Sequence, residues 1–104
     1  MRILSWNVAG IRAIIKKLPE RQSLAEFFQK QNADIICFQE TKISSYGQLT
    51  RELASIPGYD SFWAFHEKIR GSSGVVTYVK QGLAKDAYAG FHNKFFDGMY
   101  VMYV

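Results

Sequence analysis

Two polar residues, Asn7 and Glu40, stand at the ends of apolar stretches and are the first candidates for chemistry. Glu40 follows closely on the apolar residues 35–38, and Asn7 lies near the end of residues 3–8. A run as apolar as residues 35–38 predicts a strand buried on both faces. A carboxylate at the end of such a strand is costly to bury unpaired, so it either points into solvent or holds a cation. Mg²⁺ takes oxygen ligands and often needs only one or two carboxylates beside a substrate phosphate. The sequence therefore predicts half of a metal-dependent phosphodiesterase site, in which Glu40 supplies a carboxylate and Asn7 a neutral hydrogen bond.

Each of these residues also has a simpler interpretation. Glu40 would be a solvated acid paired with Lys42, two positions further along the chain. Asn7 would be a turn-forming residue before Gly10. The basic residues that follow, at positions 12, 16 and 17, would be a solvated edge of the molecule.

The elements between Asn7 and Glu40 must bring them together. Strands are predicted over residues 2–8 and 34–39, joined by a helix that starts at Pro19 and ends at Asn32. A strand, helix and strand in this order form a parallel pair with a right-handed crossover. Because the carboxyl ends of parallel strands lie at one edge of the sheet, where ligands bind, Asn7 and Glu40 are expected at that edge.

The faces of these elements and the rest of the chain follow from the apolar pattern. In the first strand Leu4, Trp6 and Val8 share one face, with Ile3, Ser5 and Asn7 on the other, and Leu24, Phe27 and Phe28 form the helical stripe. A second helix is predicted around Leu49, Leu53 and Ile56, ended by Pro57-Gly58; strands are predicted at 59–66, 75–80, 87–91 and 99–104, with turns at 71–74 and 97–98.

Composition narrows the class of protein. The chain has 104 residues, enough for one domain, and 13 basic against 9 acidic side chains give a net charge of +4, which suits a polyanionic partner. The lone Cys37 cannot form an internal disulfide, and no apolar run is long enough to span a membrane. We therefore expect an intracellular protein without a membrane partner, nuclear in a eukaryote and otherwise cytoplasmic.

The residues at the two strand ends resemble a known family. Ser-Trp-Asn-Val-Ala-Gly-Ile-Arg-Ala at 5–13, with Ala-Asp-Ile-Ile-Cys-Phe-Gln-Glu-Thr-Lys at 33–42, is similar to the exonuclease III family of AP endonucleases, within the endonuclease/exonuclease/phosphatase superfamily. Gly58-Tyr59 and residues 71–75 stand where that family has its next landmarks. The Phe-rich stretch before Gly71 looks nearest to the eukaryotic AP endonuclease 2 branch.

The resemblance implies an α/β fold, the N-terminal part of a four-layered sandwich of two packed sheets flanked by helices. It implies Mg²⁺-dependent cleavage at abasic sites, with Mn²⁺ as an alternative metal, and 3′-phosphodiesterase or exonuclease activity. The implied partner is double-stranded DNA with abasic sites or 3′ blocking groups, bound by a monomer. By the same resemblance Asn7 and Glu40 are metal-binding and catalytic residues, and Arg12, Ala13, Lys17 and Gly71 bind the DNA backbone.

The sequence also departs from the family. Ala9 stands where many members have Asp or Asn, and Ser72 where many have Tyr. The family's later aspartate–asparagine pair, catalytic tyrosine and terminal Ser-Asp-His motif are not found in residues 1–104. The chain also ends on an apolar strand, which favours an N-terminal portion of one longer domain over a docked edge strand. We expect this portion to be inactive alone.

Two other functions stay open from the sequence. The first is a superfamily relative with another phosphodiester substrate, such as a retrotransposon-type endonuclease or an RNA or phosphoinositide phosphodiesterase. The second is a non-catalytic, truncated product that binds nucleic acid, which Ala9 and Ser72 favour. Assays that compare abasic with undamaged DNA distinguish the superfamily relative from a DNA-repair enzyme. Titration with duplex DNA at low and raised salt tests the non-catalytic product.

Overall fold

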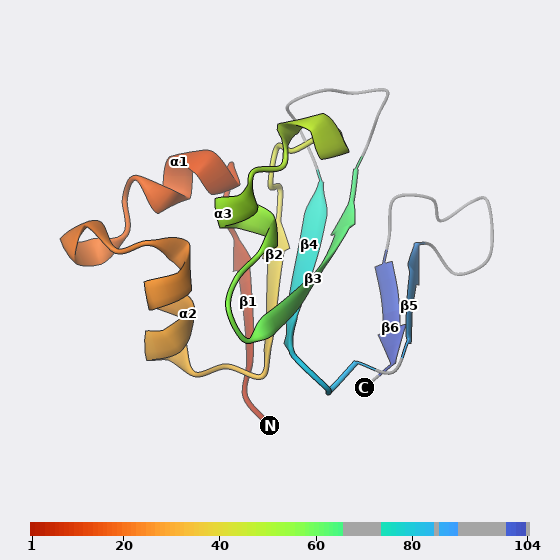
Figure 1. Ribbon diagram of the computed structural model, residues 1–104. Helices are drawn as coiled ribbons and strands as arrows, with labels where there is room; N and C mark the ends of the chain where they lie inside the picture. Colours follow the sequence, from red (N-terminus) through yellow and green to blue (C-terminus); the bar gives the residue numbers. More distant parts are fainter. Residues whose placement is uncertain (66–73, 85, 90–99, 104) are drawn as a thin grey trace.

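The computed structural model describes residues 1–65, 74–84, 86–89 and 100–103 of the chain (Figure 1). The strands are β1 (Ile3–Asn7), β2 (Ile35–Gln39), β3 (Tyr59–Ala64), β4 (Val75–Lys80), β5 (Asp86–Ala89) and β6 (Tyr100–Tyr103). The α-helices are α1 (Ile11–Ile15), α2 (Leu24–Gln31) and α3 (Arg51–Ala54), and the short 3-10 helices are η1 (Pro19–Arg21) and η2 (Tyr46–Gln48).

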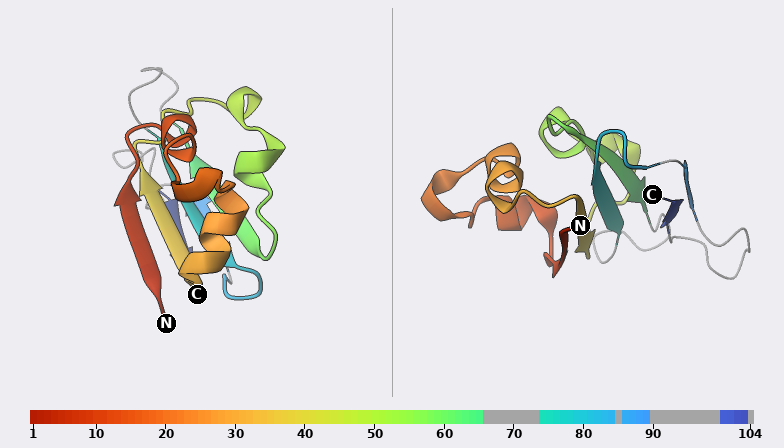
Figure 2. Two further views of the ribbon diagram at one scale, coloured as in Figure 1. Left: turned by 90° about the vertical axis from the view of Figure 1, so that its left-hand side faces the viewer. Right: turned by 90° about the horizontal axis from the view of Figure 1, so that it is seen from below.

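Four strands form one mixed sheet in the order β1-β2-β4-β3, and β5 pairs with β6 in a separate antiparallel sheet. β1 and β2 are parallel, with Ile3 opposite Ile35 and Asn7 opposite Gln39. β4 runs antiparallel to both β2 and β3. The predicted parallel pair is therefore confirmed, and the polypeptide between its strands carries α1 and α2 across one face of the sheet (Figures 1 and 2).

The core lies between this face of the sheet and the helices. Phe28 of α2 is fully buried and meets the rings of Phe38, Tyr59 and Tyr78 edge-on, at centroid distances of 6.0, 5.2 and 4.7 Å. Aromatic pairs in this arrangement add to the stabilisation that burial alone provides. The β1 faces are as predicted: Leu4 and Trp6 are half-buried and Val8 is buried, whereas Ile3, Ser5 and Asn7 are exposed.

The opposite face of the sheet is more open than the sequence suggested. An apolar run such as β2 is typical of a strand buried on both faces. In the described part of the chain Ile36 and Phe38 are buried beneath the helices, but Cys37 and Gln39 are only half-buried. Gln39 Nε2 donates a 3.0 Å hydrogen bond to Ser5 Oγ, which is on the same open face. The prediction of double burial is therefore wrong for this strand.

The predicted start of the first helix is also wrong. Pro19 opens only the 3-10 turn η1, in which Glu20 has φ 56° and cannot continue a right-handed helix. α2 instead begins after Ser23, whose Oγ accepts a hydrogen bond from the Glu26 backbone N–H while its own N–H donates to the Glu26 carboxylate. This reciprocal capping box sets the start of the helix. Its end at Asn32, in a left-handed conformation, is as predicted.

The second predicted helix is shorter than expected, and the later strands agree with prediction. α3 covers four residues, so Leu49 and Ile56 lie outside it although Ile56 is buried. β3 to β6 match the four predicted strands within a few residues. Of the predicted turn at 71–74 only Gly74 is among the described residues, and the predicted turn at 97–98 lies outside them. No helix in the described part of the chain is long and apolar enough to cross a membrane.

Candidate functional site

The ends of β1 and β2 bring Asn7 and Glu40 to one edge of the sheet. Asn7 is the last residue of β1 and stands opposite Gln39, the last residue of β2. The contact continues past both strands, because the Gly10 backbone N–H donates a 2.7 Å hydrogen bond to the Glu40 carbonyl oxygen. Asn7, at the end of β1, and Glu40, directly after β2, therefore lie at the same edge of the sheet, as predicted.

Both segments leave the sheet in an unusual backbone conformation. Ala9, Glu40 and Lys42 have φ angles of 48°, 54° and 60°, in a region that residues other than glycine seldom adopt. Such conformations cost about 1–3 kcal/mol each and persist where the surrounding structure enforces them, often at functional sites. Three residues at this edge of the sheet therefore adopt backbone conformations that their residue types disfavour.

The Glu40–Lys42 segment is anchored from β4 through Thr41. Thr41 is 1% exposed, and its backbone N–H donates a 3.0 Å hydrogen bond to the Gly74 carbonyl oxygen. Its Oγ1 accepts from the Ile43 backbone N–H at 3.3 Å. With Thr41 buried and bonded on both sides, Glu40 and Lys42 are directed to the exposed surface on either side of it.

The side-chain contacts of Asn7 and Glu40 test the simpler interpretation of each residue. Asn7 Oδ1 accepts a 3.1 Å hydrogen bond from the Ala9 backbone N–H, so Asn7 does form a turn. Glu40 is exposed, and among the described residues no ion pair joins it to Lys42 or to another cation. Glu40 is therefore a solvated acid, as the simpler interpretation has it, but without the predicted pairing to Lys42.

A cationic pocket of about 290 Å³ lies beside the pair. Lys42 lies across Gly10, where a Cβ would stand 3.4 Å from Lys42 Cδ, so a larger residue at position 10 would crowd this lysine. No carboxylate lines the pocket, and such a concentration of positive charge attracts anions. The lining residues are Ala9, Gly10, Arg12, Ala13, Lys16, Thr41 and Lys42.

The structure brings together some of the predicted DNA-binding residues and leaves others apart. Arg12 and Ala13 line the pocket, whereas Lys17 is exposed beyond the end of α1 and does not. Gly71 lies outside the described residues. Lys16 and Lys42 belong to the pocket but were not predicted as DNA-binding. The signal for Lys16 is its spacing of four from Arg12, which puts both on one side of a helical turn.

Shifted ionisation occurs away from this edge. The pKa of the Asp34 carboxyl is lowered, chiefly by the hydrogen bond that it accepts from the Arg2 backbone N–H at 2.7 Å, and Asp34 lies just before β2. Burial raises the pKa of the Tyr78 hydroxyl, which donates a 2.6 Å hydrogen bond to the Leu53 carbonyl oxygen within the core. Both shifts are explained by structural hydrogen bonds or burial, so neither indicates a second catalytic centre.

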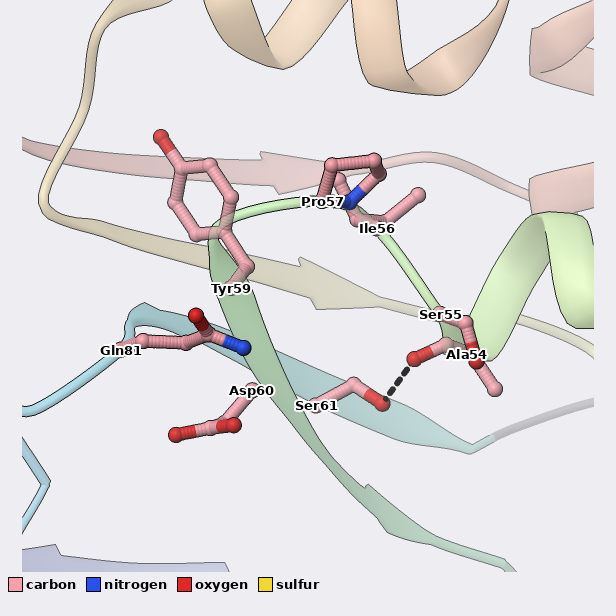
Figure 3. Close-up of a pocket in the computed structure, with 8 residues that line it drawn as sticks. All are labelled: Ala54, Ser55, Ile56, Pro57, Tyr59, Asp60, Ser61 and Gln81. Atoms are coloured by element: carbon pink, nitrogen blue, oxygen red, sulfur yellow. Dashed lines mark hydrogen bonds between the residues drawn. The ribbon is translucent and has the colours of Figure 1, made fainter.

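A separate hollow of about 390 Å³ lies between the end of α3 and the start of β3 (Figure 3). Ser61 Oγ donates a 2.8 Å hydrogen bond to the Ala54 carbonyl oxygen along its wall, and Asp60 is the only charged side chain in its lining. The start of β3 is at the opposite edge of the sheet from Asn7 and Glu40, because β3 runs in the same direction as β2. This hollow contains none of the predicted site residues.

A metal at the Asn7–Glu40 edge would depend on few protein ligands. Among the described residues no group of three or more His, Cys, Asp or Glu side chains is close enough to hold a metal ion. One carboxylate oxygen donor and a neighbouring amide oxygen still fit Mg²⁺, which keeps several waters and shares ligands with substrate phosphates. They do not fit Zn²⁺, which takes four nitrogen or sulfur-rich ligands in closed sites.

Comparison with known proteins agrees with the fold and with the resemblance seen in the sequence. The chain is 41% identical over 86 residues to DNA-(apurinic or apyrimidinic site) endonuclease 2 of Schizosaccharomyces pombe, covering 81% of the chain and 16% of that protein. It is 36% identical over 81 residues to the exodeoxyribonuclease of Bacillus subtilis, covering 78% of the chain and 29% of that protein. The chain thus spans less than a third of these relatives.

A solved structure gives the same result in three dimensions. The chain matches the Xenopus laevis APE2 catalytic domain with a TM-score of 0.73 and 37% identity, over 95% of the chain and 30% of that domain. An AP endonuclease from Archaeoglobus fulgidus, at 20% identity and a TM-score of 0.69, shares the fold. The family model of the endonuclease/exonuclease/phosphatase family matches residues 4–101. The chain therefore belongs to the endonuclease/exonuclease/phosphatase family.

Proposed function

We propose that this chain supplies the metal-binding and backbone-binding part of a DNA-repair nuclease that hydrolyses a phosphodiester bond at abasic sites. The observation that carries the proposal is the meeting of Asn7 and Glu40 at one sheet edge beside a pocket lined by cations. Family membership and relatives named for apurinic or apyrimidinic sites support the same chemistry. Exonuclease and 3′-phosphodiesterase activities of the intact domain belong to the proposal as well.

Glu40 and Asn7 are the proposed residues for Mg²⁺, with Mn²⁺ as an alternative. When bound there, the metal would offset the negative charge that builds on the phosphate during in-line attack by water. Glu40 offers a carboxylate that no cation among the described residues neutralises. Asn7 Oδ1 accepts a hydrogen bond from the Ala9 N–H, which holds the side chain in place, and the rest of its amide group is proposed to bind a metal ligand or the phosphate.

Double-stranded DNA with abasic sites or 3′ blocking groups is the proposed partner. Arg12, Lys16 and Lys42 line the pocket beside the proposed metal, and their charges suit consecutive phosphates of a DNA strand. Ala13 forms part of the same wall, and Lys17 and Gly71 are proposed to extend the contact along the backbone. We further propose an intracellular location, nuclear in a eukaryote, and a monomeric intact domain.

Residues 1–104 by themselves are proposed to lack appreciable incision activity. Hydrolysis needs a base to accept the proton of the attacking water. Glu40 cannot bind the metal and serve comfortably as that base, and the sequence offers no Ser-Asp-His element to replace it. Incision of an abasic duplex in Mg²⁺ by the purified chain, abolished by Glu40→Ala, would contradict this part of the proposal.

The metal site is tested by titrating Mn²⁺ into the chain and following the loss of the free-ion paramagnetic resonance signal. Glu40→Gln removes the charge but keeps the shape, so Mn²⁺ affinity should fall about tenfold or more. Glu52→Gln, at an exposed position on α3, is the matched control and should bind as the unmodified chain does. Equal affinity in the two variants would refute Glu40 as a ligand.

The DNA partner is tested by fluorescence anisotropy with an abasic duplex and its undamaged counterpart. Preference for the abasic duplex supports DNA repair, whereas equal binding favours the alternative of a general nucleic-acid-binding product. Arg12→Gln should weaken binding to both and lower the slope of log affinity against log salt by about 1. An unchanged salt slope would show that the cationic pocket is not where phosphate binds.

A further inference from the structure

An aromatic side chain, Tyr46, stands exposed at the same edge of the sheet. It belongs to η2 and is 68% exposed, although tyrosine rings usually find cover. Its ring is perpendicular to the ring of Phe65, with centroids 4.7 Å apart and an interplanar angle of 89°. Phe65 in turn stacks on the buried Trp63, with centroids 6.4 Å apart. The Tyr46 ring therefore packs against Phe65, which itself contacts the buried Trp63, while most of the Tyr46 surface remains in solvent.

The backbone that carries Tyr46 is fixed before any ligand arrives. Gln48 Oε1 accepts hydrogen bonds from the Ser44 backbone N–H at 2.8 Å and from Ser44 Oγ at 3.1 Å. Ser44 is 6% exposed, and the Gln48 N–H donates to the Ser45 carbonyl oxygen at 3.1 Å. A surface ring on a fixed turn loses little conformational entropy on binding, which is the property of a pre-organised contact.

Tyr46 lies at the same edge of the sheet as the cationic pocket, so a ligand of the pocket could also contact its exposed ring. Tyr46 is four positions along the chain from Lys42, so their Cα atoms are at most about 14 Å apart. In Figure 1, η2 lies on the same edge of the sheet as α1 and the ends of β1 and β2. Among the described residues, the other large apolar side chains with high exposure are Met1 and Ile3, at the N-terminal end of β1 and away from that edge.

We propose that Tyr46 is a stacking platform for an unpaired base of a DNA strand whose phosphate lies in the pocket of Arg12, Lys16 and Lys42. This inference rests on the proposed function and extends it to the single-stranded part of the substrate. An aromatic face next to a cationic groove is the combination that binds single strands with little sequence preference, because every base has a face that stacks. The positive charge of the pocket favours a polyanion as the ligand. The exposed ring of Tyr46 favours a polyanion that has unpaired bases.

The test uses the full chain and a fluorescein-labelled oligothymidylate, with binding followed by anisotropy at two salt concentrations. Tyr46→Leu keeps an apolar cover over Phe65 but removes the aromatic face, so affinity should fall about tenfold. The salt slope should not change, because no charge is lost. Tyr46→Phe keeps the face and should bind as the unmodified chain does, and so should Ile3→Ala, the matched exposed residue at the other edge.

A second measurement does not depend on any variant. Stacking of a base on Tyr46 should move the ring proton resonances of this tyrosine upfield when oligothymidylate is added to the unmodified chain. Unchanged resonances, or equal affinity of Tyr46→Leu and the unmodified chain while Lys16→Gln binds more weakly, would overturn the inference and leave the proposed function standing. No binding of oligothymidylate or duplex by the unmodified chain would contradict both.

Discussion

Gly74 approaches Thr41 so closely that a Cβ at position 74 would lie 2.6 Å from Thr41 Oγ1. The same atom would lie 2.8 Å from the Ile43 carbonyl oxygen, and Gly74 itself has φ +106°. The contact carries the hydrogen bond from Thr41 N–H to the Gly74 carbonyl oxygen that anchors the segment of Glu40 and Lys42 to β4. The position of the candidate site therefore depends on a glycine that has no chemistry of its own.

Gly74→Ala should destabilise the chain by roughly 2–4 kcal/mol, measured by urea unfolding, because left-handed strain adds to a steric clash with backbone and a buried side chain. Gly58→Ala is the matched control, since Gly58 has φ +85° and nothing within 4 Å of the added atom. That variant should lose only about 1–2 kcal/mol from strain. Equal losses in both variants would show that the clash with Thr41 is relieved by movement.

Ala9→Gly should stabilise the chain by about 0.5–1 kcal/mol, because Ala9 has φ 48° and glycine relieves that strain at a smaller cost in unfolded-state entropy. Ala13→Gly, within α1, should do the opposite by a similar amount. The two free energies of unfolding are compared in the same urea titration. Destabilisation in both would mean that the left-handed conformation at position 9 stores no strain.

Tyr78→Phe should cost about 1–3 kcal/mol at neutral pH, because it leaves the buried Leu53 carbonyl oxygen without the 2.6 Å hydrogen bond from Tyr78. Burial raises the pKa of Tyr78 above its usual value near 10, so the folded chain resists ionisation that the unfolded chain undergoes. The resulting stability is present below pH of about 10 and is lost as pH rises above it.

The same reasoning sets the pH dependence of the Tyr78→Phe variant. Its free energy of unfolding should fall less steeply with rising pH than that of the unmodified chain, as followed by denaturant titrations across the alkaline range. Tyr59, whose pKa is raised by burial and by Asp34, contributes a slope of the same sign that remains in the variant. Parallel curves for the two chains would contradict the assignment to Tyr78.

Ser23→Ala should destabilise the chain by about 1 kcal/mol, because the Glu26 N–H loses the acceptor that begins α2. The pKa of Glu26 is lowered chiefly by the hydrogen bond from the Ser23 backbone N–H and then by its side chain. That contribution to stability is present above the pKa that Glu26 has in the unfolded chain and is lost as pH falls through the lowered pKa of the folded chain. Thermal unfolding at neutral and acidic pH, with Ser45→Ala as an exposed non-capping control, measures both effects.

The placement of Asn7 and Glu40 could be predicted from the sequence because it depends on strand direction alone. Two apolar stretches with a helix between them require a parallel pair, and a parallel pair aligns its carboxyl ends. The start of α2 could not be predicted in the same way, because Pro19 fits the first turn of a helix as well as the Ser23–Glu26 capping box does. Both signals predict a helix start, and in the structure the helix begins at the capping box, whose two hydrogen bonds are reciprocal.

The cationic pocket could be predicted only in part. The resemblance predicts Arg12 and Ala13, whereas Lys42 lines the pocket from a segment in which both Glu40 and Lys42 have positive φ angles, a conformation that neither residue type signals. Thr41, between these two residues, is hydrogen-bonded to Gly74, which directly precedes β4 and is more than thirty residues away in sequence. Tertiary contacts of this kind override local preference and are not visible in a single sequence.

β1 has a neighbour on one side only within the described sheet, since the order begins β1-β2. Its amides should exchange with deuterated solvent earlier than those of β2, which is flanked on both sides. Asn7 ends the outer strand β1, and Glu40 directly follows the inner strand β2, so transient detachment of β1 would separate the amide from the acid without unfolding the helical core. A ligand that binds both Asn7 and Glu40 should therefore slow the deuterium exchange of the backbone amides of residues 3–7.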